Sequence, residues 1–135
     1  MKAGESGREL IRIGMVSSTN PKENTVRVTF EDKDNLVSSE LRILHRGSTA
    51  NKDFWMPAVG DECVCIFPTN DDNYCDGFII GTLFNQKDKP NADKQEITRM
   101  DFADGTFIEY NSKSHTLQIE CVGEIYIKGK KIYLN

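Results

Sequence analysis

The sequence has no long apolar run and none of the common catalytic motifs. No stretch of its 135 residues approaches the ~20 consecutive apolar residues of a membrane-crossing helix. Residues 1–9 lack the apolar centre of a signal peptide, and we interpret them as a flexible polar lead. Phosphate-binding loops, Gly-x-Ser-x-Gly and His-Glu-x-x-His are all missing. We therefore expect a protein that is not an enzyme.

Cysteine is too sparse and too irregularly placed to predict a metal site. The four cysteines are Cys63, Cys65, Cys75 and Cys121. They do not have the paired spacing that is typical of zinc ligands. Cys63 and Cys65 share one face of an expected strand, which favours buried free thiols. An acidic stretch from Asp72 starts like a calcium loop, but its twelfth position is Leu83 and not glutamate. The sequence thus predicts no cofactor and no metal ion.

What the first part of the chain does contain is a series of short apolar segments separated by turn residues. At residues 25–30 the alternation puts Val26, Val28 and Phe30 on one face. By the same criteria we predict five strands, at residues 10–16, 25–30, 41–44, 63–67 and 77–84. Five short strands with turns between them are typical of a small barrel of the OB type. An open five-stranded sheet is the alternative, with edges that would be unprotected.

The charge distribution argues against a nucleic-acid partner. The formal net charge is -4 and the isoelectric point is about 5.2, so no basic surface is expected. Arg12, Arg27 and Arg42 are dispersed over three expected strands and are not interleaved with aromatic residues. Since OB barrels often bind single strands, a single-stranded nucleic-acid-binding module is nevertheless the alternative function.

The last part of the chain differs in character from the first. Residues 86–96 are polar and predict a linker. Alternating segments then recur at 97–102, 106–110, 116–121, 124–128 and 132–134, which predicts β repetition. About 40 residues are too few to bury a core of their own. We expect symmetry mates to cover one apolar face, with the core candidates Leu117, Ile119, Ile125, Ile127, Ile132 and Leu134. A meander that folds back on the barrel is the alternative.

Five stretches, in this order, carry a family resemblance. They are Arg-Ile-Gly-Met-Val-Ser-Ser (12–18), Thr-Val-Arg-Val-Thr-Phe (25–30), Leu-Val-Ser-Ser-Glu-Leu-Arg-Ile-Leu (36–44), Phe-Trp-Met-Pro-Ala-Val-Gly-Asp-Glu-Cys-Val-Cys-Ile-Phe (54–67) and Gly-Phe-Ile-Ile-Gly-Thr-Leu-Phe-Asn (77–85). Residues 10–85 resemble the OB-fold module of phage baseplate assembly protein V. The same module occurs in the central spike of type VI secretion systems.

This resemblance implies an architecture and a mechanical role. A lead (1–9) and an OB-fold barrel (10–85) would be followed by a linker (86–96) and by a β-helical or β-prism needle (97–135) intertwined from three chains. The homotrimer would cap the tail tube at the baseplate, contact hub and tube proteins, and puncture the target cell envelope. It would assemble in the bacterial cytoplasm and then become part of the phage tail or tail-like particle.

The chain departs from longer family members at its end. In those members a His-x-His pair from each chain binds iron at the apex, whereas His45 and His115 are isolated here, so no metal site is carried over. A short needle capped by a separate tip protein and a natural chain that continues beyond Asn135 both stay open. The type of contractile machine also stays open, between a phage tail, a bacteriocin and a secretion system.

Overall fold

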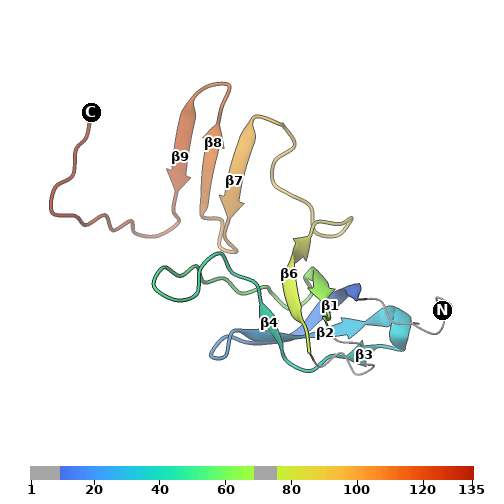
Figure 1. Cartoon of the computed structure of the whole chain (residues 1–135). Helices are drawn as coiled ribbons and strands as arrows, with labels where there is room; N and C mark the ends of the chain where they lie inside the picture. The colour runs from blue at the N-terminus through green and yellow to red at the C-terminus, as the bar shows by residue number, and fades with distance from the viewer. Residues whose placement is uncertain (1–9, 69–75) are drawn as a thin grey trace. The chain divides into compact units, whose positions relative to one another are not determined.

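The computed structural model describes residues 10–68 and 76–135 (Figure 1). Within these residues the protein is all-β, and its one helical element is the short 3-10 turn η1 (Glu31–Lys33). In the same part of the chain, no helix is long and apolar enough to cross a membrane. The predicted lead and the loop that contains Asp72 and Cys75 lie outside the described residues.

The chain divides into two compact units, Met1–Asp88 and Lys89–Asn135. The division falls inside the stretch 86–96 that the sequence predicts as a linker. Each unit is described by itself below, as unit 1 and unit 2.

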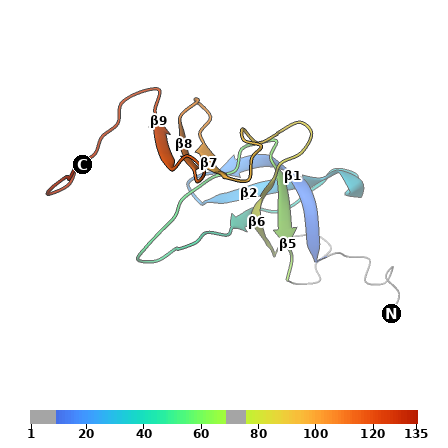
Figure 2. The same cartoon turned by 90° about the horizontal axis from the view of Figure 1, so that it is seen from above.

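The described part of unit 1 contains six strands that form one sheet. They are β1 (Ile11–Asn20), β2 (Thr25–Phe30), β3 (Leu36–Val37), β4 (Leu41–Ile43), β5 (Glu62–Ile66) and β6 (Phe78–Leu83). The sheet order is β1-β5-β6-β4-β2-β3, and β1 also pairs with β2, so that β1, β2, β4, β5 and β6 close into a ring of ladders (Figure 2, where β1, β2, β5 and β6 are labelled). We call these five strands the β-ring. The pairing of β4 with β6 is parallel, and the other pairings are antiparallel.

The inward positions of the β-ring form the core. Alternation in β2 is confirmed, since Val26, Val28 and Phe30 are all buried. The rings of Phe30 and Phe67 pack edge to face, with centroids 6.0 Å apart. Cys63 and Cys65 are buried free thiols, as predicted. The buried hydrophobic cluster consists of Val16, Val26, Val28, Phe30, Leu41, Ile43, Cys63, Cys65, Phe67 and Ile79.

Unit 2 contains one antiparallel sheet of three strands in sequence order. They are β7 (Ile97–Asp101), β8 (Phe107–Asn111) and β9 (Thr116–Glu120) (Figure 1). Gly105 (φ 98°) and His115 (φ 58°) take left-handed conformations in the two connecting turns.

The structure corrects the predicted strands at 124–128 and 132–134. Residues 121–135 are all described and contain no strand. A strand needs a neighbouring strand to satisfy its backbone N–H and C=O groups, and within the single chain this segment has none. Alternation alone therefore predicted strands that the isolated chain does not form.

Candidate interaction surface of the three-stranded sheet

The register of the three-stranded sheet assigns its side chains to two faces. Met100 pairs with Ile108, and Ile108 pairs with Ile119. Directly opposed residues point to the same side of a sheet, so these three share a face. The next row of the same face runs from Thr98 through Tyr110 to Leu117. We call this the apolar face: Thr98, Met100, Ile108, Tyr110, Leu117 and Ile119.

The apolar face is the more exposed of the two. Leu117 is 64% exposed, Met100 58% and Ile119 56%. On the opposite face, Arg99 and Glu109 are half-buried although both are charged. No residue from Lys89 to Asn135, a fully described range, is buried. Burial in soluble proteins follows the reverse pattern, and contiguous exposed apolar patches mark interaction sites. The apolar face is therefore the candidate functional surface.

Two of the six core candidates lie on this surface. Leu117 and Ile119 stand on β9, beside Tyr110 and Ile108 of β8. Sequence reasoning did not assign Met100, Ile108 and Tyr110 to the face, although each alternates in step within its own segment. The missing information was the hairpin register, which requires the position of each turn as well as the alternation.

The other four candidates lie in the segment after the sheet. Ile125, Ile127, Ile132 and Leu134 are all exposed, and the exposed fraction reaches 93% at Leu134. The segment begins with a local contact, in which the Cys121 thiol donates to the carbonyl oxygen of Glu124 at 3.5 Å. No ladder joins these residues to the apolar face within the described chain. The structure thus brings Leu117 and Ile119 together and leaves the remaining candidates without a common face.

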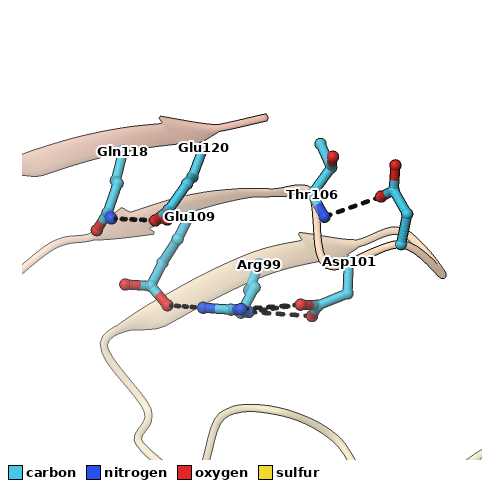
Figure 3. Close-up of polar contacts among 7 residues, drawn as sticks. Arg99, Asp101, Thr106, Glu109, Gln118 and Glu120 are labelled. Atoms are coloured by element: carbon cyan, nitrogen blue, oxygen red, sulfur yellow. Dashed lines mark hydrogen bonds and ion pairs between the residues drawn. The ribbon is translucent and has the colours of Figure 1, made fainter. Parts of the chain in front are cut away.

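The opposite face of the sheet carries a network centred on Arg99 (Figure 3). The Arg99 guanidinium donates to Asp101 Oδ1 at 2.9 Å and to Glu109 Oε1 at 2.8 Å. It also lies over the Phe107 ring, 3.8 Å from the centroid. These hydrogen bonds lower the pKa of Asp101 and raise the pKa of Arg99. Because Arg99 and Glu109 are cross-strand partners, the network favours the observed register of β7 and β8.

A second hydrogen bond closes the turn between β7 and β8. The backbone N–H of Thr106 donates to Asp104 Oδ1 at 3.0 Å, which lowers the pKa of the Asp104 carboxyl group. On β9, Gln118 donates to Glu120 at 3.1 Å (Figure 3). Arg99 and Gln118 thus donate hydrogen bonds within the chain on the face opposite the apolar face.

The described residues do not assemble a metal centre. Within 10–68 and 76–135, no group of three or more His, Cys, Asp or Glu side chains is placed to hold an ion. His45 lies edge-on to Trp55 in unit 1, with ring centroids 6.4 Å apart, and His115 occupies the turn before β9.

Comparison of the chain with protein-family models finds no matching family, and comparison with curated proteins finds no match.

Proposed function

We propose that this protein is the central spike of a contractile injection machine, which is a phage tail, a phage-tail-like bacteriocin or a related secretion system. Three chains would intertwine β7–β9 and residues 121–135 into a short β-helical or β-prism needle. One observation carries the proposal. Unit 2 has ordered strands but no buried residue, and the side chains of its apolar face are exposed.

Association of three chains would bury the apolar side chains that a single chain exposes. Full burial of one Leu, Ile or Met side chain contributes about 1.5–3 kcal/mol relative to leaving it exposed. Residues 121–135 would gain the hydrogen-bonded neighbours that they do not have in the single chain. A closed three-chain arrangement would also protect the outer edges of β7 and β9, which suits a structure that must resist axial load.

Under the same proposal unit 1 is an OB-fold barrel. The support is its ring order, β1-β2-β4-β6-β5, with a single parallel pair between β4 and β6, as in a five-stranded Greek-key barrel. The barrel seats the trimer on the baseplate hub at the end of the tail tube. The needle, alone or capped by a separate tip protein, meets the target envelope. The role is mechanical, so it requires neither catalysis nor a cofactor.

The proposal includes no nucleic-acid partner. On β1 the outward side chains of the β-ring are apolar, at Ile11, Ile13 and Met15, where a single-strand site would need cations and aromatic platforms. Labelled single-stranded DNA should therefore show no salt-dependent binding. Binding at physiological ionic strength would favour the nucleic-acid module instead.

The deciding experiment is the mass of the purified protein by light scattering after size exclusion. We expect three chains of 15.3 kDa each, and a stable monomer at micromolar concentration would contradict the needle. The double variant Ile125→Asp/Ile127→Asp should abolish the trimer and leave unit 1 folded. Tyr126→Asp, between them in the sequence, is the control that should stay trimeric. If the double variant is still a trimer, Ile125 and Ile127 do not lie at the axis of the needle.

A further inference from the structure

A second exposed apolar surface lies on the outer side of the β-ring. Ile11 pairs with Ile66, and Ile13 with Val64, across the ladder between β1 and β5. In the next row Met15 pairs with Glu62, which pairs with Leu83 of β6. The alternate positions, such as Arg12 and Cys63, are buried on the inner side. We define the outer face as Ile11, Ile13, Met15, Val64, Ile66 and Leu83.

The fold does not require these side chains to be apolar. Ile11 is 60% exposed and Ile13 52% exposed, so they contribute little to the core. On β2 of the same ring, Arg27 is an exposed polar residue between buried Val26 and Val28. A strand with apolar residues at its outward positions, next to a strand with normal alternation, indicates a surface used for contact.

One margin of the outer face forms an acidic groove of about 230 Å³. Ile13 and Met15 provide its apolar lining, and Glu31, Asp32 and Glu62 provide three carboxylates. None of the described residues that line it is basic. Asp32 pairs with Arg12, which is buried on the inner side, so the carboxylates outnumber this guanidinium. The groove fits the aliphatic stem and cationic head of an arginine or lysine.

We propose that the outer face and its acidic groove bind a different protein, one that presents an arginine or lysine beside apolar side chains. Charge complementarity decides against the same face of a second copy, because that contact would bring two sets of carboxylates together. The surface is derived from unit 1 alone. Its identification as the seat on the baseplate hub rests on the proposed function.

The test uses the full chain with labelled isoleucine methyl groups and the peptide acetyl-Leu-Arg-Leu-amide as probe. We expect saturable NMR shifts at Ile11, Ile13 and Ile66, with no shift at Ile79 in the core or at Ile119 in unit 2. Acetyl-Leu-Gln-Leu-amide should bind several-fold more weakly. Shifts of equal size with both peptides, or no shift at Ile13 at millimolar peptide, would overturn the proposal.

Two variants distinguish peptide binding in the acidic groove from contact between copies of the chain. Glu31→Gln/Glu62→Gln should weaken the arginine peptide several-fold at an unchanged unfolding temperature, and unchanged affinity would count against the groove. Ile13→Glu should keep the wild-type mass in light scattering. A changed mass would make the outer face a contact between copies and would overturn binding of a different protein. A monomeric wild type would instead contradict the trimeric needle and leave the peptide result standing.

Discussion

Gly14 of β1 lies so close to β2 that a side chain at this position would meet its atoms. A Cβ at this position would lie 2.5 Å from Val28 Cγ1 and 2.8 Å from the carbonyl oxygen of Thr29. Contacts this short require neighbouring atoms to move, and one of these is backbone. We expect Gly14→Ala to lower the free energy of unfolding by about 1–3 kcal/mol, as other overpacked sites do. Urea denaturation of unit 1, followed through Trp55, measures the change.

Gly81 provides the matched control for this substitution. It lies in β6 of the same sheet, and an added Cβ would meet nothing within 4 Å. We expect Gly81→Ala to stay within about 0.5 kcal/mol of the wild type. Equal destabilisation by the two substitutions would mean that strand flexibility, and not the contact with Val28, sets the cost.

Asp101 links the stability of the three-stranded sheet to pH. Hydrogen bonds from Arg99 hold the pKa of Asp101 below its ordinary value. A carboxyl group with a lower pKa in the folded state stabilises the fold above its unfolded-state pKa, and this contribution is lost as the pH falls through the folded-state value. The effect should be small because the pair is near the surface.

We therefore expect the unfolding temperature of the β7–β9 sheet to fall on acidification below about pH 4. Asp101→Asn should flatten part of this dependence and leave the part that comes from Asp104, whose pKa is lowered by the Thr106 N–H. Thermal unfolding at a series of pH values, monitored on the NMR signals of β8, gives the comparison. An identical pH profile for the variant would show that Asp101 does not cause the pH dependence of the unfolding temperature.

At the scale of the strand, sequence reasoning succeeded where one chain supplies both partners of a ladder. The alternation of Val26, Val28 and Phe30 predicts their burial, and the i, i+2 spacing of Cys63 and Cys65 predicts a shared buried face. β3 was missed because two residues are too few to show alternation. The segments around Ile125 and Ile132, which were predicted as strands, form none within the single chain, since strand formation depends on a neighbour as well as on the pattern.

The same dependence explains why only part of the candidate surface was predictable. Leu117 and Ile119 were identified because they alternate within one segment. Met100 and Ile108 join them only through the register of two hairpins, which turn geometry sets.

Adjacent residues of β9 test which face of the sheet would make the proposed contact between copies. Leu117 belongs to the apolar face, and Gln118 points to the opposite side. We expect Leu117→Lys to weaken assembly by about 2 kcal/mol per chain or more, because a charge would replace a Leu that the proposed needle buries. Gln118→Lys should leave the mass unchanged. Light scattering over a dilution series measures both variants, and dissociation by Gln118→Lys alone would reverse the assignment of the faces.

The two units differ in how much apolar surface they bury within one chain. Unit 1 has its own buried cluster, built around Phe30 and Phe67. Unit 2 has three paired strands and no buried residue, so its roughly 40 residues have no buried core of their own. Its stability should therefore come from association, whereas that of unit 1 should not.

Dilution separates these two sources of stability. A state stabilised by association loses free energy on dilution by mass action, and a state stabilised within one chain does not. We expect peptides from residues 97–120 to exchange their amide hydrogens faster as the protein is diluted, while peptides from β2 and β5 keep their rates. Hydrogen-exchange mass spectrometry at two concentrations reports on both units in one sample. Since both units share the same chain, solvent and temperature, β2 and β5 act as the internal control. Protection of residues 97–120 that is high and independent of concentration would mean that the sheet is stable in a single chain. That result would contradict a needle built from several chains.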